Sequence, residues 1–305
     1  MVNDARLEAF KELYPFQSRY LHLDSLRYHY LDEGRGETIL MLHGNPTWSF
    51  YYRNLIIGLK DKYRCVVPDH MGCGLSDKPQ KYDYTLARHI QNLETLADHL
   101  DLRDISLVMH DWGGAIGMGY AVRHPSRVKR LILFNTAAFL SQRIPLSINL
   151  CRMPVVGPVA IRCFNAFAGL AVFRACKRRE RMTPQVRSGY LAPYDSYANR
   201  VANLRFVQDI PMSPKAPSYS LVQSIESQLE KFRDRTVLIL WGKRDFCFDD
   251  YYLERWRGYF PDAEIHEFPD AGHYVVEDAH ERIVPLMRQF LGGRPLNTMP
   301  GNNQR

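Results

Sequence analysis

Asp111 is the residue of this chain whose position best suits covalent chemistry. The apolar run Ile105–Met109 predicts a buried strand, and the small residues of Gly114–Met118 predict a helix that follows at once. A side chain at such a sharp corner projects away from both elements, which is the geometry of a nucleophile elbow. An ionised carboxylate placed there can attack carbon and form an ester of itself. The alternative is that Asp111 only caps the helix beginning at Trp112.

An acid and a histidine follow two later predicted strands. Asp245 comes in the first turn after one apolar strand, and His273 follows the next strand along the chain. Ligands of open α/β sheets bind outside the carboxyl ends of the strands, so both side chains are expected at the edge that presents Asp111. The order nucleophile, acid, histidine is known from one class of catalytic triad, and we predict Asp245 as the acid and His273 as the base. Asp249 and Asp250 are predicted instead as charges at a helix N-terminus.

A fourth polar group is expected at the same edge. The loop His43–Trp48 follows the predicted strand Thr38–Leu42, and Asn45 offers a side-chain amide to an anion from this loop. The alternative for Asn45 is an ordinary turn residue at the surface.

The order of predicted elements indicates an α/β fold. After a hairpin at 20–32, strands alternate with helices, which predicts a mostly parallel sheet flanked by helices and joined by right-handed crossovers. The alternation stops at 137–212, a segment rich in proline, arginine and aromatic residues that predicts an inserted helical cap. We expect strands at 38–42, 63–68, 105–109, 128–134, 236–241 and 264–268, and helices that include 84–100, 219–232 and 279–291. The predicted division is a core of 1–136 and 213–291, a cap of 137–212 and a flexible tail of 292–305.

Composition excludes several classes of protein. The chain has 305 residues and 46% hydrophobic content, enough for a large core, and its net charge of +7 comes without the basic and aromatic stripe of a nucleic-acid module. Six cysteines are scattered without a Cys-x-x-Cys pair, so we expect reduced thiols in a cytoplasm and no metal site. The charged segment Met1–Tyr14 does not match a secretory signal. Neither a GxGxxG nor a Walker pattern is present, and we expect no cofactor.

Three motifs carry a resemblance to a known family, namely HGNPT at 43–47, MGCGLSDKP at 71–79 and HDWGG at 110–114. Together they resemble the haloalkane dehalogenase branch of the α/β-hydrolase superfamily, over about residues 20–291. The resemblance implies an α/β-hydrolase fold in which Asp111 displaces halide and His273 activates water. It also implies that Asn45 and Trp112 hold the departing anion with side-chain N–H groups, and an indole N–H is a donor only.

The chain resembles another group of that superfamily more than it resembles the haloalkane dehalogenases, namely the β-lactone decarboxylases of long-chain olefin biosynthesis. Asn135 follows an earlier strand, where some dehalogenases carry the third triad member, and it is not an acid. The cap segment 143–154 also resembles that group. The resemblance implies that Asp111 opens a cis-3,4-dialkyl β-lactone, after which loss of carbon dioxide leaves a cis-alkene. The haloalkane dehalogenase is the alternative, and an epoxide hydrolase or a non-catalytic ligand receptor fits the motifs less well.

Two features of the implied reaction stay open. Asp111 attacks either the ring carbon that bears oxygen, giving an ester, or the lactone carbonyl, giving a mixed anhydride. Arg244 is expected to pair with the carboxylate freed from the lactone, and its alternative is a solvent-facing arginine. The resemblance further implies a multienzyme assembly with a β-lactone synthetase and an olefin-pathway reductase.

The predicted cap contains an apolar segment at 153–173, which is followed by a basic run at 174–179. Arg162 lies in the middle of the apolar segment and argues against a membrane span, because a charge at mid-membrane is costly. We expect cap helices that line a channel for the two alkyl chains of a lipid-like substrate. The alternatives are a peripheral contact with anionic lipid and an ordinary core helix followed by solvated charges.

Overall fold

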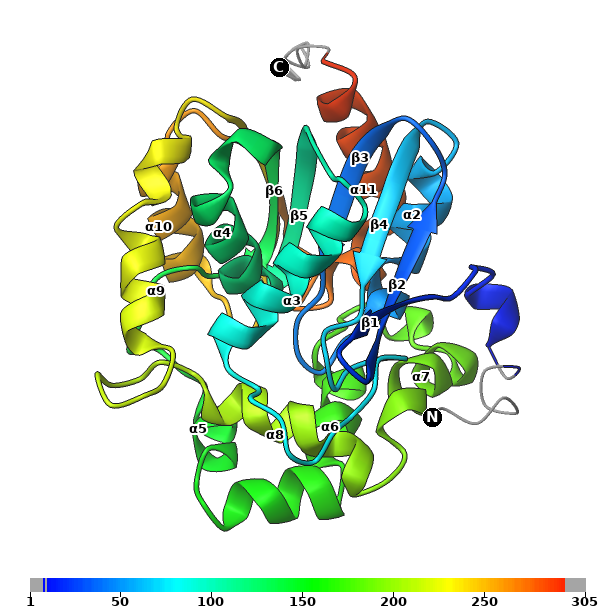
Figure 1. Ribbon diagram of the computed structural model, residues 1–305, viewed down its shortest axis with the longest axis vertical. Coiled ribbons are helices and arrows are strands. Elements are labelled where there is room, and N and C mark those ends of the chain that lie inside the picture. The colour runs from blue at the N-terminus through cyan, green and yellow to red at the C-terminus, as the bar shows by residue number, and fades with distance from the viewer. Residues whose placement is uncertain (1–7, 9, 294–305) are drawn as a thin grey trace, which may run out of the picture.

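The computed structural model describes residue 8 and residues 10–293, which are built around one eight-stranded sheet (Figure 1). The strand order is β1-β2-β4-β3-β5-β6-β7-β8. β1 pairs antiparallel with β2, and β2 with β4, whereas the remaining pairs are parallel. The strands are β1 (Arg19–Leu23), β2 (Leu26–Glu33), β3 (Glu37–Leu42), β4 (Tyr63–Pro68), β5 (Ile105–Asp111), β6 (Val128–Thr136), β7 (Thr236–Gly242) and β8 (Glu264–Phe268). The predicted mostly parallel sheet is confirmed.

Helices cover both faces of this sheet. Leu107 and Met109 of β5 belong to one buried cluster, and Val108 between them belongs to the other. Because both faces are shielded from water, the middle parts of the central strands are continuous apolar runs instead of alternating apolar and polar residues. The core helices that contribute to the first cluster are α3 (Leu86–His99), α4 (Trp112–Arg123), α9 (Tyr219–Glu226) and α10 (Asp250–Tyr259), and those that contribute to the second are α2 (Arg53–Leu59) and α11 (Val275–Leu291). Short 3-10 turns are η1 (Lys11–Leu13), η2 (Ser49–Tyr52), η3 (Pro125–Arg127), η5 (Arg179–Arg181), η6 (Ala192–Tyr194), η7 (Ala198–Arg200) and η8 (Leu229–Phe232).

Some elements differ from their predicted limits. β5 runs on to Asp111, because a register shift lets this corner residue pair with Thr136 of β6. α11 begins at Val275 instead of Ala279, and a break in its helical geometry at Ala279 (φ −141°, ψ 18°) separates the first residues from the predicted helix. The first five residues are all buried, so no amphipathic spacing marks them in the sequence. The helix expected over 219–232 is divided into α9 and η8.

The segment between β6 and β7, residues 137–235, contains helices and no strand. Its first helices lie together at the lower end of Figure 1, beyond the carboxyl ends of the parallel strands. They are α5 (Leu146–Cys151), the π-helix η4 (Pro158–Cys163), α6 (Ala166–Arg174), α7 (Pro184–Leu191) and α8 (Val201–Gln208). Among the described residues, no helix is long and apolar enough to cross a membrane.

The division into a core of 1–136 and 213–291 and a cap of 137–212 stays a prediction, although we use the word cap for the helices α5 to α8. Residues 294–305 of the predicted flexible tail lie outside the described residues.

A buried ion pair fastens this cap to the second face of the sheet. Arg53 of α2 donates two hydrogen bonds of 2.7 Å to the Glu277 carboxylate of α11, and the Tyr190 hydroxyl of α7 donates another at 2.8 Å. Both charged side chains are only 3% exposed, and the guanidinium lies 4.2 Å from the centre of the Phe50 ring. Removing one partner therefore leaves an uncompensated charge in a dry environment.

We predict that Arg53→Met lowers the free energy of unfolding by about 3 to 5 kcal/mol near neutral pH, because the Glu277 carboxylate loses its cation while it stays buried. Urea denaturation followed by circular dichroism measures the change. The matched control is Arg103→Met, which removes an exposed pair with Asp101 and should cost less than about 1 kcal/mol. Equal effects of the two substitutions would contradict the structural role of the buried pair.

Candidate active site

Asp111 forms the corner between β5 and α4 with a left-handed backbone, at φ 51° and ψ −124°. Its carbonyl oxygen accepts a hydrogen bond of 2.5 Å from Thr136 Oγ1. Its carboxylate Oδ1 accepts a hydrogen bond of 2.7 Å from the backbone N–H of Asn45. Non-glycine residues with positive φ are strained and concentrate at functional sites. The corner thus turns a buried carboxylate toward the loop after β3.

Two glycines beside Asp111 allow the backbone to pack closely enough for this corner. A Cβ atom on Gly113 would lie 2.0 Å from the carbonyl oxygen of Leu42, so a larger residue would push α4 away from β3. A Cβ atom on Gly44 would lie 2.1 Å from Asp111 Oδ1 and would displace the carboxylate. The glycines of the HGNPT and HDWGG motifs are therefore required by close approach.

His273 and Asp245 lie on the other side of the same carboxylate. His273 Nδ1 is 2.8 Å from Asp245 Oδ2, and His273 Nε2 is 3.7 Å from Asp111 Oδ2. The other carboxylate oxygen of Asp245 accepts a 2.6 Å hydrogen bond from the backbone N–H of Cys247. The bond to Asp245 orients the imidazole, so that Nε2 faces Asp111. The structure thus brings together the three predicted triad residues.

The electrostatic environment of the site alters two pKa values. Burial raises the pKa of the Asp111 carboxyl above its usual range, while His273 and the N–H groups of Asn45 and Trp112 act in the opposite direction. Burial alone would lower the pKa of His273, but the carboxylates of Asp245 and Asp111 outweigh burial and hold the pKa above the ordinary value of 6.5. A protonated His273 therefore stabilises the ionised form of Asp111.

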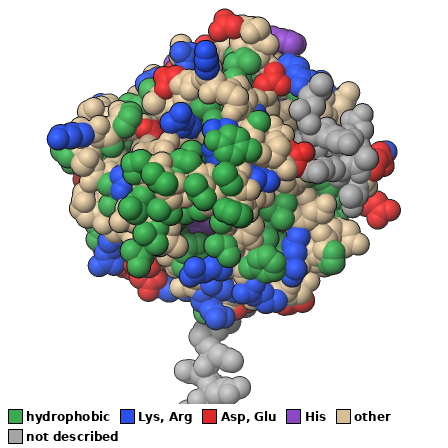
Figure 2. Space-filling view, turned by 90° about the horizontal axis from the view of Figure 1, so that it is seen from below, with side chains coloured by type: hydrophobic (Ala, Val, Ile, Leu, Met, Phe, Trp, Pro, Cys, Tyr) green, Lys and Arg blue, Asp and Glu red, His purple; other side chains and the backbone are tan. Residues whose placement is uncertain are grey.

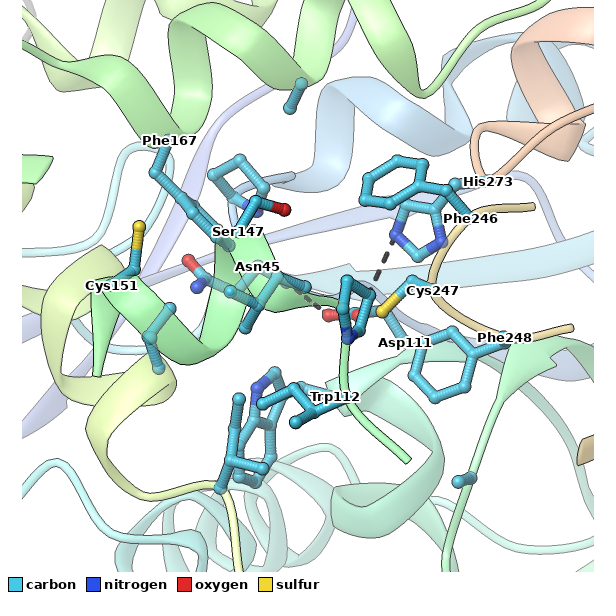
Figure 3. A pocket seen from close by; sticks show the side chains of 18 of the residues that line it. Asn45, Asp111, Trp112, Ser147, Cys151, Phe167, Phe246, Cys247, Phe248 and His273 are labelled. Atoms are coloured by element: carbon cyan, nitrogen blue, oxygen red, sulfur yellow. Dashed lines mark hydrogen bonds and ion pairs between the residues drawn. The ribbon is translucent and has the colours of Figure 1, made fainter. Parts of the chain in front are cut away.

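Asn45 and Trp112 lie at one end of a cavity of about 400 Å³ that Asp111 and His273 also line. In Figure 3, Asn45 and Trp112 lie on one side of the Asp111 carboxylate, and His273, Phe246 and Phe248 lie on the other. The Asn45 amide nitrogen donates one hydrogen bond of 3.1 Å to the carbonyl of Asn203, which leaves its second hydrogen for a ligand. Most of the lining is apolar, and α5 and α6 contribute more of it than any other helix, with further residues from the turn after β7.

Arg244 is the predicted site residue that the structure does not bring to the others. Its side chain is exposed, and the residue is absent from the cavity lining. Its backbone N–H bonds to the carbonyl of Ala271, and the turn after β7 directs Asp245 inward instead. The exposed side chain fits the alternative, a solvent-facing arginine, and binding of a substrate carboxylate by Arg244 stays a prediction. The basic residues among the cavity-lining set are Arg143 and Arg174, from the cap segment.

The family described as alpha/beta hydrolase fold matches the chain over residues 37–155 and 165–279. The chain belongs to this family. This α/β hydrolase is 48% identical to the cis-3-alkyl-4-alkyloxetan-2-one decarboxylase of Shewanella oneidensis, over 92% of this chain and 89% of the relative.

Two further similarities bear on its place within the α/β hydrolases. A protein of Xanthomonas campestris pv. campestris, also named cis-3-alkyl-4-alkyloxetan-2-one decarboxylase, is 46% identical over 88% of this chain and 93% of the relative. The crystal structure of haloalkane dehalogenase DatA from Agrobacterium tumefaciens C58 superposes with a TM-score of 0.79 at 26% identity, covering 90% of this chain and 96% of that chain. The predicted resemblance to both branches is thus confirmed, and sequence identity is higher to the proteins named decarboxylases.

Several residues that are not among the predicted catalytic or anion-binding groups hold the site in place. Asn135 exchanges two hydrogen bonds with Gly242, at 3.0 and 2.8 Å, and so ties the end of β6 to the turn that carries Asp245. His110 is paired through Nε2 with the carbonyl of His273 at 2.8 Å, and its ring stacks on Tyr51. The sequence did contain a signal for His110, because a residue next to Asp111 at the end of a buried strand is expected to be buried beside the site.

The partner of the Asn45 amide had no such signal. The Asn203 carbonyl that accepts its hydrogen bond lies in α8, 158 residues further along the chain. This contact depends on how the cap folds over the sheet, which local sequence patterns do not specify.

We predict that Asp245→Asn lowers the pKa of His273 by about 1 to 3 pH units, because the substitution removes the carboxylate that offsets burial. The titration is followed by nuclear magnetic resonance of the histidine side chains in the folded protein. Asp249→Asn is the matched control, since Asp249 caps α10 and accepts a hydrogen bond from Tyr251. An unchanged His273 titration in Asp245→Asn would show that burial and Asp111 alone set its pKa.

Proposed function

We propose that this α/β hydrolase is a β-lactone decarboxylase, which converts cis-3,4-dialkyl-oxetan-2-ones to cis-alkenes and carbon dioxide in the last step of long-chain olefin biosynthesis. The observation that carries the proposal is the Asp111 carboxylate facing a largely apolar cavity, with N–H donors on one side and His273 on the other. The names of the relatives at 48% and 46% identity support this choice of reaction.

In the first step, ionised Asp111 attacks the ring carbon that bears oxygen. A bond forms between that carbon and a carboxylate oxygen of Asp111, and the ring carbon–oxygen bond breaks, with its electron pair going to the lactone oxygen. The products are an enzyme ester and a free substrate carboxylate. Asn45 and Trp112, which line the cavity beside Asp111, donate N–H groups to the oxygen where negative charge appears.

In the second step, the bond to the carboxylate breaks and carbon dioxide leaves. The electron pair of that bond forms the alkene, and the ester bond to Asp111 breaks, which restores the aspartate carboxylate. No proton, oxidant or water is consumed, so the two steps balance without a cofactor. Inversion in the first step followed by anti elimination preserves the cis geometry of the substrate.

His273 and Asp245 have a different role here from the one they have in a hydrolase. No water needs activation, so His273 acts as a cation next to Asp111, and Asp245 positions the imidazole and supports its charge. In the first step this charge stabilises the ionised nucleophile, and in the second it stabilises the carboxylate that departs. The apolar cavity lining supports the same reaction, because decarboxylation is faster when a carboxylate is poorly solvated.

Haloalkane dehalogenase activity is the second candidate. It is favoured by the 3.7 Å distance between His273 Nε2 and Asp111 Oδ2, which suits a histidine that activates water against an aspartyl ester. The two functions differ in product, because a lyase releases alkene from a synthetic cis-β-lactone and a dehalogenase releases bromide from 1,2-dibromoethane.

We predict that Asp111→Asn abolishes alkene formation from a cis-β-lactone, with a loss of at least about 1,000-fold in kcat/KM, because a neutral amide is not a competent nucleophile. Gas chromatography of the alkene measures the rate. Asp249→Asn, which changes an acid that is exposed at a helix N-terminus, should retain the wild-type rate. Persistent alkene formation by Asp111→Asn would rule out covalent catalysis by this residue.

The pH dependence of alkene formation separates the two candidate roles of His273. A hydrolytic base must be neutral, so its activity is lost as the pH falls through the raised pKa of His273, above 6.5. In the lyase, protonated His273 supports ionised Asp111, so we predict that kcat/KM for alkene formation is retained as the pH falls through the pKa of His273 and declines only when Asp111 itself takes up a proton. It should also decline as the pH rises and His273 loses its proton. Initial rates at constant ionic strength, with circular dichroism to verify folding, test this order. An acidic decline centred above pH 6.5 would assign the base role to His273.

The remaining proposals concern the surroundings of the enzyme. We infer a lipid-like substrate with two alkyl chains, and from the resemblance a multienzyme assembly with a β-lactone synthetase and an olefin-pathway reductase. A cytoplasmic location is supported by the six cysteines, all of which are free thiols. The last of these proposals is a peripheral contact between the cap and a membrane. The exposed surface of the cap supports it.

A further inference from the structure

The cap presents a large apolar surface to solvent, which we call the cap face. Its most exposed members are Leu146, Val155 and Phe164, whose side chains are 73%, 74% and 76% exposed. Figure 2 shows the cap face as a cluster of hydrophobic side chains around a hollow in which a histidine is visible. Large exposed apolar patches on a folded protein mark contacts with another apolar surface.

The mouth of the active-site cavity opens within the cap face. Leu150, Val156 and Leu170 are exposed and also line the cavity that reaches Asp111 and His273. They come from α5, the segment before η4 and α6, so the rim of the mouth is itself apolar. A molecule that enters or leaves by this mouth crosses the cap face.

The charge of this segment is of one sign. Residues 137–179 contain seven lysine or arginine residues and no aspartate or glutamate. Figure 2 shows basic side chains around the hydrophobic cluster, and Arg174 and Arg179 are exposed. An apolar centre with a basic rim matches the interface of a bilayer that contains anionic lipid, where apolar side chains enter the acyl region and cations contact headgroups.

We propose that the cap face binds the surface of a bilayer containing anionic phospholipid, and that the two-chain substrate passes from the bilayer into the cavity through the mouth beneath it. The choice of substrate rests on the proposed function, whereas binding to the bilayer does not. Each methylene group moved from lipid into water costs about 0.8 kcal/mol. Transfer within an apolar contact therefore avoids a barrier that increases with the length of both alkyl chains, and the alkene product leaves by the same route.

The contact is peripheral. No helix among residues 8 and 10–293 is long and apolar enough to span a bilayer. Arg162 of η4 stays outside the acyl region, where its guanidinium lies over the Tyr197 ring at 3.9 Å. The apolar side chains of α5, η4 and α6 insert to the boundary between headgroups and acyl chains.

Vesicle flotation tests the proposal with the full-length protein. The probes are vesicles of phosphatidylglycerol and phosphatidylethanolamine, compared with vesicles of phosphatidylcholine alone. We expect binding to the anionic vesicles that weakens at high salt. The triple variant Leu146→Ser, Val155→Ser, Phe164→Ser should bind at least about tenfold more weakly, since it removes three inserting side chains. The matched control is Ile57→Ser, an exposed apolar residue of α2, which Figure 1 shows well away from α5 and α6, and it should bind as the wild type does.

Activity measurements with two substrates test the route. The three substituted side chains are not among the cavity-lining residues, so the triple variant should process a short, water-soluble cis-β-lactone at the wild-type rate. With a long-chain lactone supplied in anionic vesicles, its rate should fall about as far as its binding does. Equal rates of wild type and variant on the vesicle substrate would overturn the proposed route.

Two outcomes would overturn the membrane contact itself. One is absence of binding to anionic vesicles, or equal binding by the wild type and the triple variant. The other is light scattering that shows an oligomer of the wild type and a monomer of the triple variant, which would make the cap face an interface between copies of this chain. Flotation needs no substrate, so the measured binding to vesicles would be the same if the decarboxylase proposal failed. Failure of one proposal can therefore be distinguished from failure of the other.

Discussion

The structure depends on keeping the carboxylate of Asp111 at the end of β5, in a site that is shielded from water. Burial works against the charge of Asp111, and an isolated buried carboxylate would take up a proton instead. The N–H groups of Asn45 and Trp112 and the imidazole of His273 offset this cost from opposite sides. These groups come from separate parts of the chain. The site therefore exists only once the sheet has brought the carboxyl ends of its parallel strands to one edge.

Close packing around that carboxylate explains why the motifs contain small residues. Gly44 and Gly113 let the loop after β3 and the start of α4 approach Asp111. Asn135 ties the ends of β6 and β7 together, so that the next turn presents Asp245 to His273. The site retains the groups of a hydrolase, and in the proposed lyase the substrate itself expels the aspartate before water is needed. An apolar cavity suits that outcome, since it disfavours both water and a solvated carboxylate.

The cap links this chemistry to the physical nature of the substrate. Its inner side chains line the cavity, while neighbouring residues of the same short helices are exposed around the mouth. In an enzyme that takes its substrate from water, a cap helix would be amphipathic and would turn its polar residues toward the solvent. In α5 and α6 both sides carry apolar residues, and the charges around them are basic. In our proposal, the lipid-like character of the substrate accounts for both the apolar lining and the apolar exterior.

The sequence alone determined the α/β fold, the corner at Asp111 and the order of Asp245 and His273, because these follow from local periodicity and from residue types that recur at strand ends. Tertiary structure decided the rest. The Asn203 carbonyl reaches Asn45 from α8, Asn135 bonds to Gly242 across two strands, and Arg244 turns outward although it adjoins Asp245. The first turn of α11 was missed because residues buried on every side carry no helical period. Such features depend on contacts between distant segments, and only the packed chain specifies those contacts.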